Sequence, residues 1–339
     1  MAPRDALVAQ GAVGRDALVA HGSARRDALV AYARASMARG SKSFGAASRL
    51  FDPVMRERVW MLYAWCRACD DLVDGQDHGG TLGPVADVEA RLSRIESLTS
   101  AALAGEETGE PAFDCLAMVA AECALPRRYV DDLLEGFALD AEGWRPETIE
   151  DLLAYCYHVA GAVGCLMAIV MGVAADDDGV IDRACDLGLA FQLANVARDV
   201  VEDAAGGRCY LPGQWLSEMD LEEKALLTDA ARPRLAILTG RLAALAERYE
   251  ASARVGTPML SFRAAWAVLA AAGIYGGIAR RVGQAGQRAL DVRVSTGRGE
   301  KLGWLLRAAG QAAARERLYP AAVRDAGLWR RPRGGLPRL

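Results

Sequence analysis

Apolar side chains recur every three to four residues along most of this 339-residue chain, which places them on one face of an α-helix. No run alternates apolar and polar residues with the period of two that is typical of a strand. Proline and glycine mark the ends of the helical segments. Asp52-Pro53, for example, is a helix start with an acidic cap and a proline in the first turn. The pattern predicts an all-α protein, and no linker is long enough to require a domain boundary.

The periodic segments define the expected helices. They span residues 53–74, 84–103, 111–123, 126–140, 146–172, 178–205, 221–255 (a surface pair broken near Pro233), 261–293 and 300–318. Residues 155–175 are long and uncharged enough to cross a bilayer, but His158 within them and acidic residues at both ends favour a buried central helix. In that helix Ala160, Gly161 and Gly164 allow a second helix to approach closely, or leave a groove for a long apolar ligand.

The two ends of the chain differ from its centre. The hexapeptide RDALVA begins three times in the first 33 residues, eleven residues apart, which stacks its Leu-Val pairs on one side of a helix. We interpret residues 1–33 as an extension, either an amphipathic arm that touches a membrane or a partner, or a duplication that only lengthens a helix.

Residues 34–318 form the expected single domain. The basic, Pro- and Gly-rich residues 319–339 are expected to be disordered.

The most informative stretch runs from Phe191 to Tyr210. At ~100° per residue, one narrow stripe of this otherwise apolar helix is formed by Gln192, Asn195, Asp199 and Asp203. A solvated stripe would normally use Lys and Glu, whose long stems tolerate water at low cost. Short carboxylates and amides instead suit hard cations and phosphate oxygens. This stripe is therefore a candidate binding site rather than a solvated face.

A second stripe repeats this design upstream. In VWMLYAWCRACDDLVDG, one face carries Tyr63, Arg67, Asp70 and Asp74. Two carboxylates ~6 Å apart in a partly buried pocket repel by about 3 kcal/mol at an effective dielectric constant of ~20, so four of them need compensating cations. Mg²⁺ fits because it binds through one or two carboxylates plus substrate phosphates. We predict that the two stripes form two walls of a cation-filled pocket, where Arg67 and Arg198 add forked donors to phosphate.

These parts imply a class of substrate. Metal ions and arginines that bind a diphosphate also stabilise it as a leaving group. Its departure leaves a carbocation, which water would quench, so the apolar central helices are expected to supply dry walls. A long allylic prenyl chain with a diphosphate head is the substrate that needs both parts.

Composition indicates which kinds of partner and which cellular compartment to expect. Residues of the AVILMFWYC set make up 52% of the chain, enough for a sizeable core without disulfides, and the net charge of −4 argues against a nucleic-acid surface. The eight cysteines lack regular spacing and the N-terminus lacks an apolar export core, so we expect reduced thiols in the cytoplasm. Cys66 and Cys69 form a CxxC without a second pair, a weak zinc candidate. A solvated acidic face is expected at Asp131, Asp132, Glu135 and Asp140.

Four segments resemble the signature segments of the squalene/phytoene synthase family, and most of all those of its bacterial phytoene-forming members. They are SKSF (41–44), LYAWCRACDDLVD (62–74), YCYHVAGAVG (155–164) and LGLAFQLANVARDVVEDAAGGRCYLP (187–212), in matching order within residues 30–315. The resemblance implies an all-α isoprenoid-synthase bundle around a central cavity. It also implies head-to-head condensation of two geranylgeranyl diphosphates, through the cyclopropyl prephytoene diphosphate, to phytoene for carotenoid biosynthesis.

The resemblance also implies roles for single residues. Asp70 and Asp74 match the first metal motif, while Asp199 and Asp203 match the second, next to the metal-facing amide Asn195. Tyr155 matches a catalytic tyrosine near the reacting carbons, Phe44 an aromatic that can face the cation, and Arg67 and Arg198 diphosphate contacts. The implied substrate-binding positions are Ser41, Phe44, Tyr63, Arg67, Gln192, Asn195, Arg198, Tyr210, Tyr275 and Arg293.

Several alternatives share parts of this pattern. Squalene and dehydrosqualene synthases use the same motifs on farnesyl diphosphate. Head-to-tail prenyl synthases share the DDxxD pattern and terpene cyclases the Asn-Asp-Asp spacing, but the YCYHVAGAVG helix and Arg198 decide against both. Non-catalytic assembly factors with this fold typically lose the aspartates, and all four are present here.

The resemblance further implies a set of cofactors and partners. We expect Mg²⁺, with Mn²⁺ as a substitute, and no NADPH. The expected partner is geranylgeranyl diphosphate, and nucleic acid is not expected. Peripheral membrane contact and contact with other carotenoid-pathway enzymes stay open.

Overall fold

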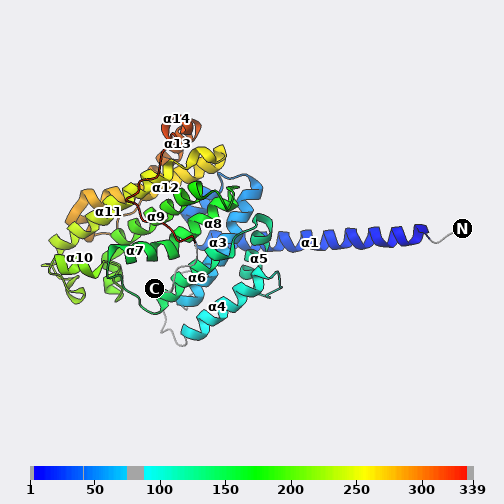
Figure 1. Cartoon of the computed structure of the whole chain (residues 1–339), viewed down its shortest axis with the longest axis horizontal. Coiled ribbons are helices and arrows are strands. Elements are labelled where there is room, and N and C mark those ends of the chain that lie inside the picture. The colour runs from blue at the N-terminus through cyan, green and yellow to red at the C-terminus, as the bar shows by residue number, and fades with distance from the viewer. Residues whose placement is uncertain (1–3, 41, 75–87, 334–339) are drawn as a thin grey trace. The chain divides into compact units, whose positions relative to one another are not determined.

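The computed structural model describes residues 4–40, 42–74 and 88–333, which form helices and turns without a strand (Figure 1). The all-α prediction is confirmed. The chain divides into two compact units, one made of residues 1–45 and 56–124 and the other of residues 46–55 and 125–339. The short helix α2 (Lys42–Ser48) includes residues of both units.

The first unit is built from α1 (Arg4–Gly40), most of α3 (Pro53–Asp74), α4 (Val88–Leu103) and α5 (Pro111–Cys123). The helix starts expected at Pro53 and Pro111 are confirmed, because proline's fixed φ suits the first turn. The helix expected from residue 84 begins, within the described residues, at Val88. Residues 75–87 lie outside the described residues.

Helix α1 continues without a break through residue 33, so the repeat-bearing extension and the start of the expected domain share one helix (Figure 1). Its Arg26 donates to Glu57 (2.7 Å) and to Glu122 (2.7 Å), and Arg58 on α3 donates to the other oxygen of Glu122 (2.7 Å). Burial by itself raises the pKa of Glu122, but the hydrogen bonds from Arg26 and Arg58 outweigh it and lower the pKa below its ordinary value. These ion pairs hold α1 to α3 and α5.

The second unit is built mainly from the helices between residues 127 and 318. They are α6 (Arg127–Ala141), α7 (Ile149–Cys156), α8 (Ala162–Val170), α9 (Asp178–Ala205), α10 (Gly213–Glu218), α11 (Arg232–Arg254), α12 (Phe262–Ala285), α13 (Arg298–Ala313) and α14 (Arg315–Leu318). Short 3₁₀ turns lie at Glu223–Ala225, Thr257–Met259 and Gly286–Leu290. The bounds expected for α9 are confirmed, with Asp177 as its N-cap.

Helix α9 is the centre of this unit and contacts α7, α8, α11 and α12. Leu189 and Leu193 are fully buried, each contributing roughly 2 kcal/mol by the usual area relation. A Cβ atom on Gly188 would lie 2.3 Å from the carbonyl oxygen of Ala160, and one on Gly164 would lie 2.4 Å from that of Ala184. The close helix approach expected from the small residues is confirmed, and it leaves no room there for a ligand groove.

The helix expected over residues 146–172 is interrupted. A capping box between Thr148 and Asp151 starts α7 at Ile149, three residues later than expected. A π-helical turn at Tyr157–Gly161 then separates α7 from α8. Such turns often lie at functional sites.

The surface helix pair expected over residues 221–255 is not what the structure shows. Pro233 does not break a helix but lies in the first turn of α11, a position that needs no backbone N–H. Helix α11 also contributes buried Leu235, Leu238 and Leu242, because it packs on α9 and α12. Its apolar stripe therefore belongs to the core.

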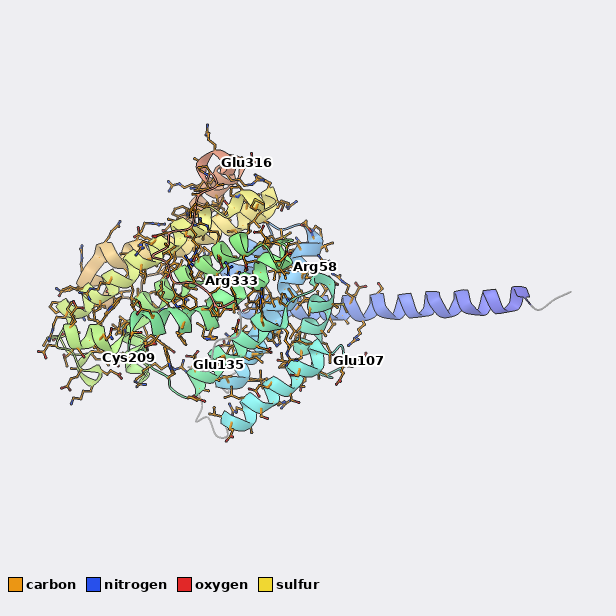
Figure 2. The ribbon with its side chains drawn as sticks, in the orientation of Figure 1. Arg58, Glu107, Glu135, Cys209, Glu316 and Arg333 are labelled. Carbon is orange, nitrogen blue, oxygen red and sulfur yellow. The ribbon has the colours of Figure 1, made fainter. Side chains whose placement is uncertain are left out.

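The C-terminal segment is ordered through residue 333, contrary to the disorder expected from its composition. Arg324 forms a forked pair with the fully buried Asp186 (2.6 and 2.9 Å), and Leu328 is buried. Arg331 pairs with Asp182 (2.7 Å), and Arg333, labelled in Figure 2, lies 3.3 Å from Asp178. These arginines pair with acidic side chains of α9, which balance the positive charge of the C-terminal segment. Residues 334–339 lie outside the described residues.

Two helical stretches of the described residues are long and apolar enough to cross a membrane, Ile149–Val170 and Phe262–Leu290. Of their most apolar windows, 72% and 61% are buried inside the protein. Both are therefore core helices, as expected for the first of them.

Candidate active site

The polar stripe on α9 begins with two amides. Nδ2 of Asn195 donates to Oε1 of Gln192 at 3.4 Å, a long hydrogen bond between neighbouring turns. Both residues are half-buried, and the positions next to them on the helix, Leu193, Ala194, Val196 and Ala197, are buried and apolar. The stripe predicted from the sequence is thus present as a polar face.

One turn further along, Asp199 is enclosed by two arginines. Nε of Arg198 donates to Oδ1 (2.7 Å), and Arg293 donates through Nε (2.7 Å) and Nη2 (3.0 Å) to the two oxygens. Burial raises the pKa of Asp199, but the hydrogen bonds from Arg198 and Arg293 outweigh it and hold the pKa below its ordinary value. Two forked guanidinium groups therefore meet at one carboxylate, an arrangement that also suits a diphosphate.

Asp203 differs from its neighbour. Its pKa is raised to about 6, first by burial and then by the negative charge of Asp199, while Arg208 acts in the opposite direction. Asp140 adds a smaller effect of the same sign as Asp199. The ionised form of Asp203 is thus disfavoured by burial and by its acidic neighbours, and a bound cation would favour it.

Next to this stripe, two predicted pocket tyrosines share one acid. The hydroxyl groups of Tyr155 and Tyr210 donate to the same oxygen of Asp140, at 2.8 and 2.9 Å. The ring of Tyr155 stacks on Tyr210 (centroids 5.1 Å apart) and on Trp144 (5.5 Å). Asp140 and Trp144 were not among the expected site residues.

The expectation of a solvated acidic face on α6 is wrong for two of its members. Asp140 accepts hydrogen bonds from Tyr155 and Tyr210, and Asp132 accepts one from Tyr157. Asp131 is exposed, as expected. The sequence carries no signal for this difference, because the tyrosines come from other segments.

Tyr275 on α12 faces α9 through another ring pair. Its ring stacks on Phe191 with centroids 4.3 Å apart and an interplanar angle of 24°. Phe191 directly precedes Gln192, so the pair lies beside the start of the polar stripe. Tyr275 is thus placed with the other predicted positions of this unit.

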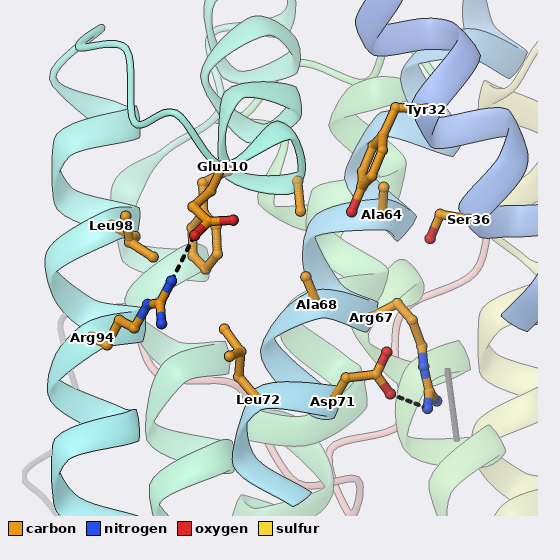
Figure 3. Close-up of a pocket in the computed structure, with 12 residues that line it drawn as sticks. Tyr32, Ser36, Ala64, Arg67, Ala68, Asp71, Leu72, Arg94, Leu98 and Glu110 are labelled. Atoms are coloured by element: carbon orange, nitrogen blue, oxygen red, sulfur yellow. Dashed lines mark hydrogen bonds and ion pairs between the residues drawn. The ribbon is translucent and has the colours of Figure 1, made fainter. Parts of the chain in front are cut away.

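In the first unit, Arg67 on α3 is the centre of the second stripe. It pairs with Asp70 (2.9 Å) and with Asp71, as the close-up in Figure 3 shows for Asp71. The Asp70 side chain is 46% exposed and that of Asp71 only 12%. Asp71 was not an expected site residue. Asp74 ends α3, and its side chain lies outside the described residues.

Asp71 and Arg67 line a cavity of about 210 Å³ among α1, α3, α4 and α5 (Figure 3). A second ion pair in its wall joins Arg94 to Glu110 (2.6 Å). The volume is below the roughly 300–1,000 Å³ usual for ligand pockets, and both ion pairs are internally matched. The ion pairs in its wall therefore hold Arg67 in place, and the cavity is too small for a prenyl chain.

Two further predicted positions of the first unit form a ring pair. Phe44 stacks on Tyr63 with centroids 5.9 Å apart and an interplanar angle of 25°. A Cβ atom at Gly40 would lie 2.2 Å from the Tyr63 hydroxyl, so glycine is required where α1 ends against this ring. Ser41 lies outside the described residues.

The donors fit a hard divalent cation. Among the residues described here, no three His, Cys, Asp or Glu side chains gather around one point, and the thiols of Cys66 and Cys69 are free. Asp199 and Asp203, however, supply carboxylates one turn apart, with an amide at Asn195, and oxygen donors are what Mg²⁺ prefers. A bound cation would also stabilise the ionised form of the buried Asp203, whose pKa is raised.

The helical architecture is that of the isoprenoid synthases. A solved dehydrosqualene synthase with bound ligand superposes with a TM-score of 0.76 at 26% identity, covering 85% of this chain and 98% of that one. The squalene synthase HpnC from Alicyclobacillus acidocaldarius superposes with a TM-score of 0.67 at 25% identity, covering 77% of this chain and 95% of that one.

The chain belongs to the squalene/phytoene synthase family, whose model matches residues 37–300. It is 47% identical to the phytoene synthase of Pseudescherichia vulneris over 88% of this chain and 97% of that protein. It is likewise 47% identical to the 15-cis-phytoene synthase of Pantoea ananas over 88% of this chain and 96% of that protein. The family and the helical fold expected from the sequence are both confirmed.

Proposed function

We propose that this protein is a phytoene synthase, a prenyltransferase that joins two geranylgeranyl diphosphates head to head through prephytoene diphosphate. The supporting observation is the 47% identity to two bacterial phytoene synthases across almost their whole length. The described site residues carry the charges and rings that this reaction needs. Membership in the family supports a prenyl diphosphate substrate and dependence on a divalent metal.

The protein's charged residues bind and orient the diphosphate heads. Arg67, Arg198 and Arg293 each present a planar fork that matches phosphate oxygens in a bidentate way. Without ligand, carboxylates occupy these forks, so a diphosphate with its cations can exchange into them. Mg²⁺ or Mn²⁺ supplies charge neutralisation of the leaving diphosphate. The proposed metal-holding residues are Asp70, Asp74, Asn195, Asp199 and Asp203.

Aromatic rings stabilise the carbocation, and apolar helices protect it from water. Ring faces carry negative potential and attract cations, which suits the pairs Phe44–Tyr63 and Phe191–Tyr275. The buried apolar faces of α8, α9 and α12 exclude water that would quench the cation. The cation then loses a proton to form the central double bond of phytoene, which requires no NADPH.

The test is a product analysis by mass spectrometry. Purified protein is incubated with Mg²⁺ and either the C20 or the C15 diphosphate, with and without NADPH. We expect phytoene and diphosphate from the C20 substrate, independent of NADPH and absent in excess EDTA. Squalene that appears only with NADPH, or a clear preference for the C15 substrate, would contradict the proposal.

A second candidate is a squalene or dehydrosqualene synthase that acts on farnesyl diphosphate. The two solved structures that superpose at 26% and 25% identity, a dehydrosqualene synthase and a squalene synthase, favour this candidate. The 47% identity to phytoene synthases outweighs it. The C15 arm of the same experiment separates the two candidates.

A further inference from the structure

Asp140, at the end of α6, holds two pocket tyrosines through a single oxygen. Tyr155 and Tyr210 donate to its Oδ1 at 2.8 and 2.9 Å. The stacked rings of Trp144, Tyr155 and Tyr210 keep both hydroxyl groups on the side of the acid, with interplanar angles of 18° and 20°. Tyr210 and Asp203 line the same small cavity, so the cluster adjoins the second aspartate motif.

This geometry determines what Tyr155 can do. Its hydroxyl hydrogen points to Asp140 and the Tyr210 hydroxyl lies beside it, so a lone pair on the phenol oxygen is what Tyr155 can offer to a further partner. Burial, and then the nearby charge of Asp140, raise the pKa of Tyr155 well above its ordinary value, so the phenol stays neutral. A neutral phenol accepts a proton from a carbocation only if its own proton leaves at the same time.

We propose that Asp140 is the terminal proton acceptor of the reaction, acting through Tyr155. The inference rests on the proposed function, which puts Tyr155 beside the reacting carbons. In this step the C–H bond next to the cation breaks, and its electron pair becomes the central double bond. The released proton bonds to the Tyr155 oxygen, and the original hydroxyl proton moves to Oδ1 of Asp140. Charge balances, because one cation and one carboxylate become neutral.

The competing acceptor is the displaced diphosphate. Asp140 differs from it in being hydrogen-bonded to the tyrosine before substrate binds. Because Asp140 acts through Tyr155, it is a positioning residue whose loss should change the fate of the cation and not only its rate of formation.

The same helix offers a matched control. Asp132 accepts a hydrogen bond from the buried Tyr157, in the π-helical turn directly after α7. Like Asp140, Asp132 is a partly buried acid of α6 paired with a tyrosine, but neither Asp132 nor Tyr157 is a predicted pocket position. A purely structural role would make the two acids behave alike.

The experiment compares Asp140→Asn with Asp132→Asn in the full chain, with geranylgeranyl diphosphate and Mg²⁺. Asparagine still accepts from the tyrosine but cannot take the proton. For Asp140→Asn we expect at least a ~100-fold fall in phytoene formation, as for loss of a general base, and a shift of products toward water-quenched C40 alcohols. Asp132→Asn should keep the wild-type product ratio. A wild-type ratio from Asp140→Asn would overturn the proposal.

Tyr155→Phe keeps the test decisive if Asp140→Asn folds poorly, and a double-mutant cycle tests whether the two groups act together. Tyr155→Phe preserves the ring stack and removes the hydroxyl, so by itself it should cause the same product shift. The double variant should lose no more than the worse single variant, because the two groups act as one relay. Unchanged products from Tyr155→Phe, or losses that multiply, would overturn the relay. Absence of phytoene from the wild-type protein would instead contradict the proposed function.

Discussion

The two helices that carry the aspartate motifs neutralise their acids in opposite ways. On α9, the carboxylate of Asp199 is bound by two guanidinium groups, those of Arg198 and Arg293. On α3, the guanidinium group of Arg67 is bound by two carboxylates, those of Asp70 and Asp71. The first group therefore has one excess positive charge and the second one excess negative charge.

This difference assigns different tasks to the two helices. The group on α9 can receive a diphosphate directly, because a second fork becomes available when the anion enters. The group on α3 has to gain a cation before an anion is attracted. Burial differs too, since the Asp199 side chain is 18% exposed and that of Asp70 is 46% exposed. Removal of a charge should therefore affect stability more on α9.

The largest expected effect is loss of turnover in Asp70→Asn and Asp199→Asn. Each should lower turnover by at least ~10³-fold, about 4 kcal/mol in barrier, because a metal ligand is lost. Thermal denaturation should separate the two variants: Asp199→Asn should lower Tm, since it leaves two arginines without their acid, whereas Asp70→Asn should not. Asp131→Asn, at an exposed acid, is the control. Near-normal turnover in either variant, or in excess EDTA, would contradict the metal site.

The second effect is a pH dependence of stability at Asp203. The pKa of about 6 in the folded protein lies above the 3.8 of an unperturbed aspartate, so the folded state binds more protons than the unfolded state between these pH values. In EDTA, the free energy of unfolding should therefore fall as pH rises from ~4 to ~6, by at most about 3 kcal/mol. Urea denaturation should show a flatter profile for Asp203→Asn. Identical profiles for the variant and the wild type would rule out this burial effect.

A smaller effect is expected for the arginines of α9. Arg198→Ala and Arg293→Ala should each raise KM for the prenyl diphosphate by roughly 10- to 100-fold, the range for hydrogen bonds to charged groups of about 1.5–3 kcal/mol. Arg293 should lie at the lower end because its side chain is 56% exposed. Arg241→Ala, which breaks a forked surface pair with Glu218, is the control. An unchanged KM in both site variants would remove these arginines from diphosphate binding.

The smallest effect concerns the N-terminal repeat. Deletion of residues 2–22 should change specific activity by less than about twofold, roughly 0.4 kcal/mol, because the ion pairs of Arg26 with Glu57 and Glu122 remain. Arg26→Ala should instead lower Tm, because these ion pairs, made by the first residue of the third repeat copy, hold α1 and the first two copies do not. A tenfold loss of activity on deletion, or loss of membrane association in cells, would support the amphipathic-arm interpretation.

Local signals in the sequence were sufficient for most helix bounds. Helix α5 begins and ends where Pro111 and Cys123 predicted, and α9 begins and ends where Asp178 and Ala205 predicted. Caps, prolines and the 3.6-residue period act within a few residues, so they can be recognised without knowledge of the fold. The start of α7 and the π-helical turn after it were missed, because the apolar run continues through both.

The sequence by itself determined the helical class, the family and which side chains share the polar stripes of α3 and α9. Only the tertiary structure decided the partners of those side chains. Arg293 reaches Asp199 over 94 positions, Tyr210 reaches Asp140 over 70, and Arg324 orders the C-terminal segment through Asp186 over 138. Periodicity is a property of neighbouring residues, whereas the partner of a charge or a hydroxyl depends on which helices pack together. That packing is set by the whole core. Composition therefore predicted disorder for the C-terminal segment and solvent exposure for Asp140, although distant residues bind both.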